Sequence, residues 1–146
     1  MTEEPRWVAF VHGADRTGTL TALAGVFSTR GVSFESLTTG QVSGGVGLIV
    51  VTFVATERRQ RLLIRTVERL AAVRSVQVRA ADDPGVRAAG VVHLPAGVPV
   101  DTSLGADLLW SGSTDGGGPV IVEGPLVQVE RWWPTRWLRG RRRWPR

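Results

Sequence analysis

Residues 6–80 alternate between β-rich runs and helical patterns, and the order of these segments leaves few folds open. Two segments carry apolar residues every three or four positions, as on one face of a helix, whereas the others are extended. The order β-α-β-β-α-β predicts an α+β ferredoxin-like fold, in which two helices pack on one face of an antiparallel sheet. The other face then needs a partner or a second layer. The predicted strands are 6–12, 32–42, 46–55 and 73–79, and the predicted helices are 17–30 and 57–72.

Each predicted helix is defined by an apolar stripe and by residues that suit its ends. Thr17 is suited to cap the first helix, and Gly31 after Arg30 is suited to end it. Glu57 at the start of the second helix favours the helix dipole. Arg and Glu cover the rest of the second helix, so it should pack one face on the sheet. The stripes are Leu20, Leu23, Ala24 and Phe27 in the first helix and Leu63, Val67 and Leu70 in the second.

The pattern weakens after the break ADDPG at 81–85. We expect short strands there and no helix, with Gly124-Pro125 joining the last two strands as a hairpin. The stretch that includes DGGG at 115–118 is predicted to be a loop. The expected organisation is a main domain at 6–80, a β-rich extension of uncertain fold at 81–130 with strands at 90–94, 119–123 and 126–130, and a flexible Arg/Trp-rich tail at 131–146.

The composition excludes several kinds of chemistry. The chain has 146 residues and no cysteine, which rules out disulfides, thiolate metal sites and a cysteine nucleophile. His12 and His93 are too few for most metal sites, so neither a metal nor another cofactor is expected. The N-terminus lacks the features of a signal peptide, and the apolar run at 46–55 is too short to span a bilayer. A cytoplasmic protein is expected.

Positive charge is concentrated at the C-terminal end. Residues 131–146 hold seven of the 18 arginines and no acid, whereas residues 1–130 carry 11 arginines against 13 acidic residues, a net charge of −2. The tail interleaves Trp with Arg, which suits contact with nucleic acid or an anionic membrane. Two other interpretations stay open: a solvated, disordered end, or packing of Trp132 and Trp133 on the open sheet face. Binding that is lost at high salt would favour the electrostatic interpretation.

The loop GADRTGT at 13–19 lies between the first strand and the first helix. Its two glycines have the spacing of a phosphate-binding loop, but Thr19 and Leu20 stand where that motif needs Lys and then Ser or Thr. Nucleotide hydrolysis is therefore not expected. The free N–H groups of a helix N-terminus suit a carboxylate as well, so a small amino acid can bind there with its ammonium near Asp15. Alternatively, the two glycines only form a tight turn.

The segment GTLTALAGVFSTRGVSFESLTT at 18–39 resembles ACT domains, most of all the small regulatory subunits of acetohydroxyacid synthase (acetolactate synthase). That family has a glycine at the start of the first helix, a leucine two residues later and a phrase similar to GLFSxRGYNIESLTV. Gly18, Leu20 and the run from Gly25 to Thr38 follow this pattern without a gap. The resemblance covers about half of the chain.

The resemblance implies a non-enzymatic regulatory subunit that senses an amino acid in branched-chain amino-acid biosynthesis. It implies side-by-side dimers, an effector such as valine bound between the loop and the neighbouring subunit, and a separate catalytic chain that uses thiamine diphosphate. Asp15 and Ser33 replace asparagines that help to hold the effector in the family; Asp15 suits an ammonium but repels a carboxylate, and Ser33 reaches less far. The implied ligand-binding residues are Asp15, Arg16, Thr17, Gly18, Thr19 and Leu20, whose backbone amides near Gly18 receive the carboxylate, and Ser33 and Phe34 on the opposite wall.

No catalytic group is expected among the remaining polar residues. Glu35 and Asp15 lie on different elements, so they do not form a general acid–base pair, and His12 is best explained as structural. Two alternatives to the sensor stay open: an ACT domain that only dimerises while the tail binds nucleic acid or membrane, and one that binds no ligand and simply holds subunits together. The second helix is expected to carry a solvated arginine face, made of Arg58, Arg59, Arg61, Arg65 and Arg69.

Overall fold

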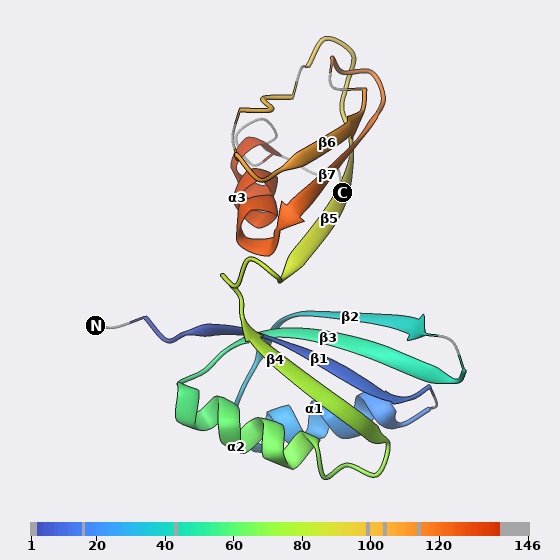
Figure 1. The fold of residues 1–146 in the computed structure, drawn as a ribbon, viewed down its shortest axis with the longest axis vertical. Coiled ribbons are helices and arrows are strands. Elements are labelled where there is room, and N and C mark those ends of the chain that lie inside the picture. Colours follow the sequence, from blue (N-terminus) through green and yellow to red (C-terminus); the bar gives the residue numbers. More distant parts are fainter. Residues whose placement is uncertain are drawn as a thin grey trace, which may run out of the picture. The chain divides into compact units, whose positions relative to one another are not determined.

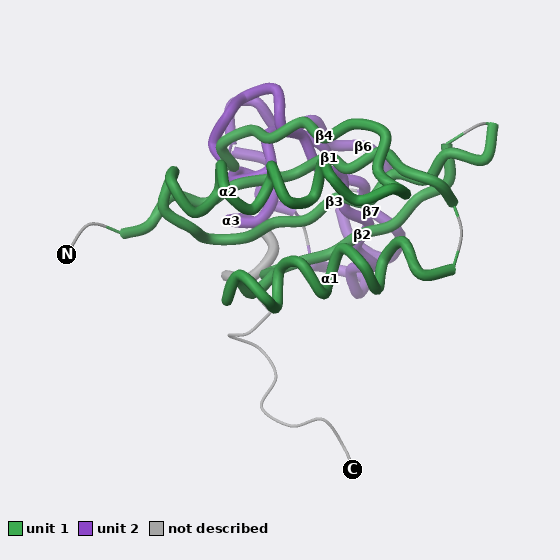
Figure 2. Tube along the Cα trace, turned by 90° about the horizontal axis from the view of Figure 1, so that it is seen from below, with its two compact units in different colours: residues 1–81 green, residues 82–146 purple. Residues whose placement is uncertain are grey.

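The chain forms two compact units, residues 1–81 and 82–146, which Figure 2 shows in different colours. Each unit has its own cluster of buried apolar side chains. Among the described residues, no helix combines the length and the apolar character that crossing a bilayer requires. The computed structural model describes residues 3–15, 17–42, 44–98, 100–103, 105–113 and 115–137, with side chains as far as Trp132 in the last helix.

Unit 1 has the α+β ferredoxin-like order that the sequence predicted. Its four strands form an antiparallel sheet in the order β2-β3-β1-β4, and both helices lie on the same face of that sheet (Figure 1). The central strands are therefore β3 and β1, and β2 and β4 are the edges. The elements are β1 (Arg6–Ala14), α1 (Thr19–Thr29), β2 (Phe34–Val42), β3 (Val46–Val54), α2 (Glu57–Val67) and β4 (Val73–Ala80).

The core of unit 1 lies between the sheet and the two helices. Alternate residues of β1 and β3 point into it, as the period of two in a strand requires. Phe27 of α1 packs edge-on against Phe53 of β3, with ring centroids 5.3 Å apart. On the side of α2, Leu63 and Val67 are fully buried, as their helical spacing predicted.

Helix α1 ends where the sequence predicted but begins differently. Gly31 has a φ of 64°, and the N–H of Val32 donates to the carbonyl of Phe27, which is the usual hydrogen bond of a left-handed helix stop. At the other end the N-cap is Gly18 and not Thr17. The chain turns at Gly18 with a φ of 96°, a conformation that only glycine adopts freely. Thr17 therefore lies one residue too early to cap the helix.

The apolar stripe predicted for α1 is also shifted. The buried residues are Thr19, Leu23 and Phe27, whereas Leu20 is 41% exposed. The hydroxyl of Thr19 donates to the carbonyl of Ala14 at 2.9 Å, so this polar side chain can face inward. Leu20 is thereby freed from the core and lies at the surface beside the loop.

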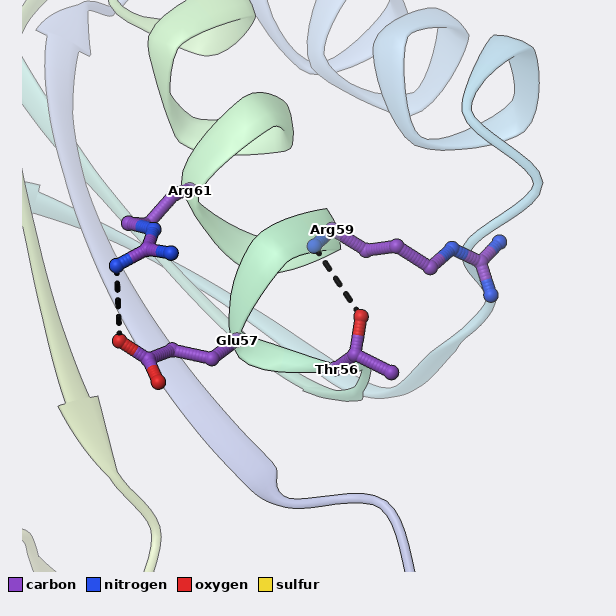
Figure 3. A network of polar contacts seen from close by, with 4 residues as sticks. All are labelled: Thr56, Glu57, Arg59 and Arg61. Atoms are coloured by element: carbon purple, nitrogen blue, oxygen red, sulfur yellow. Dashed lines mark hydrogen bonds and ion pairs between the residues drawn. The ribbon is translucent and has the colours of Figure 1, made fainter.

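Helix α2 has the capped start that α1 lacks. The hydroxyl of Thr56 accepts a hydrogen bond from the backbone N–H of Arg59, and Glu57 adds a carboxylate in the first turn (Figure 3). The helix ends at Val67, five residues before the predicted end, because the following residues form turns in which the N–H of Leu70 donates to Val67. A tight turn is needed there so that β4 can start at Val73.

Unit 2 is a three-stranded antiparallel sheet, in the order β5-β7-β6, with one helix packed against it. Two predictions are wrong here: residues 126–130 are helical and do not form a hairpin with β7, and a strand lies at 109–112 where a loop was expected. A lone apolar alternation over five residues cannot separate a strand from a helix. The elements are β5 (Arg87–His93), β6 (Leu109–Gly112), β7 (Pro119–Pro125) and α3 (Leu126–Trp137).

The first residues of the tail belong to α3. Trp132 is only 6% exposed and packs edge-on against Trp110 of β6, with ring centroids 5.0 Å apart. It therefore belongs to the core of unit 2, and the alternatives of a solvated end or a cover for the open sheet of the main domain are wrong for this residue. The side chain of Trp133 and residues 138–146 lie outside the described part of the chain.

Candidate functional site

A cavity of about 170 Å³ opens where β1 ends and α1 begins. It lies at one end of the sheet of unit 1, where the loop after β1 meets the end of β2 and the start of β3. Apolar and polar groups both reach it, including the carboxylate-bearing residue Asp15. The lining residues are Gly13, Ala14, Asp15, Thr19 and Leu20 from β1, the loop and α1, and Thr39, Gly40, Gly47, Leu48 and Ile49 from β2 and β3.

The N-terminus of α1 beside this cavity has no internal cap. Gly18 offers no side-chain acceptor, and the first turn of the helix contains no acidic residue. Its first N–H groups and its positive dipole end are therefore unsatisfied by the helix itself. Helix α2 has both features, through Thr56 and Glu57. Of the two helices of unit 1, α1 therefore offers the better binding site for the hydrogen-bond acceptor of a ligand.

Two backbone contacts fix the loop beside the cavity. The N–H of Ala14 donates to the carbonyl of Ala72 at 2.8 Å, and that of Asp15 donates to Gly45 in the turn between β2 and β3 at 3.1 Å. A glycine is needed at position 13 because a Cβ there would lie 2.6 Å from the carbonyl oxygen of Ala72. The loop is thus held on both sides.

The structure places the predicted site residues in two groups. Asp15, Thr19 and Leu20 line the cavity, and Thr17 and Gly18 lie exposed in the loop next to it. Arg16 lies outside the described residues. Phe34 is the first residue of β2 and Ser33 precedes it, at the opposite end of that strand from Thr39 and Gly40. Phe34 packs on Phe27 with ring centroids 5.1 Å apart. Within one chain, Ser33 and Phe34 do not line the cavity.

Most of the lining residues were not among the predicted site residues: Gly13 and Ala14 of β1, and the five residues from β2 and β3. Thr39 and Gly40 lie near the end of β2, and Gly47 to Ile49 lie near the start of β3. The predicted turn at 43–45 could have indicated them, because a turn between two strands places their adjoining ends at the same end of the sheet as the loop after β1. The register confirms this, because His12 pairs with Leu48 and Gly13 with Gly47.

The other polar candidates form no second centre. Glu35 forms an ion pair with Arg6, far along the sheet from Asp15. His12 lies half-buried on β1 and does not line the cavity. In the part of the chain that the structure describes, no three His, Asp or Glu side chains gather as metal ligands would.

The order of the strands and the single helical layer define a ferredoxin-like fold. The chain shares its fold with the small subunit of acetolactate synthase from Thermotoga maritima, at a TM-score of 0.62 and 14% identity over 87% of this chain and 83% of that chain. The predicted ACT-type fold is therefore confirmed. The sequence matches no protein-family model, and no curated protein matches it.

Two further solved structures are similar at lower TM-scores. One is the regulatory subunit of aspartate kinase from Thermus thermophilus, with a TM-score of 0.48 and 13% identity over 90% of this chain and 94% of that one. The other is the ACT domain of GTP pyrophosphokinase from Chlorobium tepidum, with a TM-score of 0.45 and 16% identity over 52% of this chain and 99% of that one.

Proposed function

We propose that this protein is a non-enzymatic regulatory subunit that senses an amino acid. The observation that carries the proposal is the open cavity at the uncapped start of α1, on a fold shared with an acetolactate synthase small subunit. The cavity is smaller than the ~300–1,000 Å³ of pockets for drug-sized ligands, so it suits a small metabolite. An amino acid has a carboxylate and an ammonium group, which match the positive end of the α1 dipole and the carboxylate of Asp15.

The ligand would lie with its carboxylate on the N–H groups of the first turn of α1. Asp15 lines the cavity, and its carboxylate can accept a hydrogen bond from the ligand's ammonium group. The lining also includes the apolar residues Leu20, Leu48 and Ile49. This combination favours valine, leucine or isoleucine as the effector, and it links the protein to branched-chain amino-acid biosynthesis.

A homodimer through β2 would complete the site. β2 is an edge strand in which eight of nine residues are exposed, and it contains no proline. Antiparallel pairing with a second copy about a two-fold axis sets the start of one strand beside the end of the other. Ser33 and Phe34 of the partner subunit would then lie at the same end of the paired strands as Thr39 and Gly40, and would form the opposite wall of the cavity.

Regulation follows from linkage. An effector that binds across the dimer stabilises one arrangement of the two subunits. A partner that prefers this arrangement then binds more tightly, and the partner strengthens effector binding by the same coupling free energy. We propose that the partner is the catalytic subunit of an amino-acid biosynthetic enzyme, because one structural neighbour with the same fold is a small subunit of acetolactate synthase. The protein itself contributes no reacting group, and its action is cytoplasmic.

A thermal-shift screen of the twenty amino acids tests the proposal. A ligand at one hundred times its Kd adds about 2.7 kcal/mol to the free energy of unfolding, so valine, leucine or isoleucine should raise the Tm. Gly18→Asp should abolish the shift, because its carboxylate takes the place of the ligand's. Gly18→Asn is the matched control, since it has the same shape without the charge and should keep part of the shift.

No shift with any amino acid would leave a dimerisation module whose tail binds nucleic acid or an anionic membrane. Because α3 extends to Trp137, the deletion that tests this alternative should begin at residue 138. It removes five of the seven tail arginines. Salt-sensitive RNA binding that this deletion abolishes, together with a flat amino-acid screen, would overturn the sensor.

A further inference from the structure

A second hollow, of about 430 Å³, runs between the outer faces of α1 and α2. Figure 1 shows both helices on the same face of the sheet, and Figure 2 looks onto this helical layer. The groove shares no lining residue with the cavity beside the loop. We call it the α1–α2 groove, and it is lined by Ala22, Gly25, Val26, Thr29, Arg30, Thr66 and Leu70.

Gly25 keeps this groove open at a cost to the helix. It lies in the interior of α1, where glycine is less stable than alanine by about 0.8–1 kcal/mol. Its φ is not positive, and a Cβ built on it would meet no atom within 4 Å. Neither the backbone nor the packing of unit 1 therefore requires a glycine here. Departures from local propensity without a structural reason are typical of functional surfaces.

The groove carries one positive charge, the guanidinium of Arg30. The guanidinium of Arg30 donates one hydrogen bond to the hydroxyl of Thr66 at 2.9 Å, and no carboxylate of the described residues pairs with it. Residues 57–69 contribute five arginines against two glutamates, although residues 1–130 as a whole have a net charge of −2. Residues 1–81 alone hold ten arginines against six acidic residues, a net charge of +4, so unit 1 is basic and its helical layer favours an acidic partner.

We propose that the α1–α2 groove docks an acidic amphipathic helix of a partner protein. An apolar side chain of that helix lies over Gly25, and a carboxylate next to it pairs with Arg30. The 11 residues of α1 span about 16 Å at 1.5 Å per residue, so the groove matches about three turns of a third helix. The proposal does not depend on amino-acid binding in the cavity.

The charge distribution argues against two other occupants. A second copy docked groove to groove would bring two basic surfaces together, which like charges oppose. Nucleic acid would use the arginines but has no need of the hollow over Gly25, since phosphate contacts do not require an apolar recess.

The proposal is tested by fluorescence anisotropy with a fluorescein-labelled helical peptide of about 18 residues. The peptide carries Leu at i, i+3, i+4 and i+7 and Glu on its other face, and the same peptide with Lys in place of Glu is the control. The full-length protein should bind the Glu peptide at least about tenfold more tightly than the Lys peptide. Gly25→Leu and Arg30→Gln should each weaken binding about tenfold.

The controls separate docking from folding and from general charge. Leu is a better helix former than Gly, so Gly25→Leu should keep or raise the Tm while it fills the groove. Arg58→Gln removes the same charge from α2 outside the groove lining and should weaken binding less than about threefold.

Three outcomes would overturn the proposal. One is a failure of the peptide assay, in which either the Glu and Lys peptides bind equally well or Gly25→Leu binds the Glu peptide as tightly as the wild type does. Another is a wild-type oligomer, seen by light scattering, that Gly25→Leu dissociates, which would assign the groove to a second copy. The third is an RNA oligonucleotide that displaces the peptide and binds Gly25→Leu as tightly as the wild type.

Discussion

Three glycines of unit 1 serve three different purposes. Gly13 allows a close backbone contact with Ala72, Gly18 adopts a left-handed conformation at the start of α1, and Gly25 does neither. Of these three glycines, only Gly25 lacks a conformational or packing reason. The role of a glycine in this unit therefore depends on the backbone conformation and on the atoms around it.

Gly13→Ala should destabilise unit 1 by about 1–3 kcal/mol, the usual cost of overpacking. Its Cβ would lie 2.6 Å from the carbonyl oxygen of Ala72, so the backbone of β1 or of the turn before β4 must move. Urea unfolding measures the difference. The control is Gly40→Ala, where a Cβ meets no atom within 4 Å and the change should stay within about 0.5 kcal/mol. Equal costs would contradict this explanation.

Among the elements, α1 depends on α2 for its C-terminal end. The guanidinium of Arg59 donates to the carbonyl oxygens of Arg30 at 3.2 Å and Gly31 at 2.9 Å, which α1 leaves without internal partners. Arg61, two residues later, only pairs with Glu57 at 3.0 Å on an exposed helix surface (Figure 3). Two neighbouring arginines therefore differ in what they stabilise.

Arg59→Met should lower the free energy of unfolding by about 1 kcal/mol, because it removes a charged donor from two helix-end carbonyls. Arg61→Met is the matched control and should cost no more than about 0.3–0.5 kcal/mol, as for other exposed pairs four residues apart. Thermal unfolding followed by circular dichroism compares the two. A control variant that is the less stable of the pair would show that the cap contributes nothing.

The edge strand β2 makes a prediction about assembly. Thr38 is its middle residue, so antiparallel pairing centred there sets two copies of residue 38 opposite each other. Thr38→Lys should then convert a dimer into monomers, because like charges directly opposite across strands repel. Light scattering gives the mass, and Gln77→Lys on the other edge strand is the control. A variant that stays dimeric would place the interface elsewhere.

At the scale of the whole molecule, the two units have separate cores. The core cluster of unit 1 contains only residues between Trp7 and Val78, and all strand pairs stay within one unit. This organisation is expected of parts that fold separately.

A fragment of residues 1–81 should therefore unfold in one cooperative step. Trp7 is its single tryptophan, and its indole N–H donates to the carbonyl of Ala55 at 2.9 Å, so its fluorescence reports on the native core. At ~0.05–0.15 kcal/mol per residue, its free energy of unfolding should be about 4–12 kcal/mol. A gradual transition without a baseline would mean that unit 1 needs residues 82–146 to fold.

The sequence alone determined the order and type of the elements in residues 6–80 and the end of α1. Helical and strand periods are local, and Gly31 needs only its own backbone to stop a helix. Only the tertiary structure decided that residues 126–130 are helical, since Val129 and Trp132 bury against a sheet built from distant strands. It also decided that Thr39 and Leu48 meet the loop, because strand register brings together residues that the chain separates.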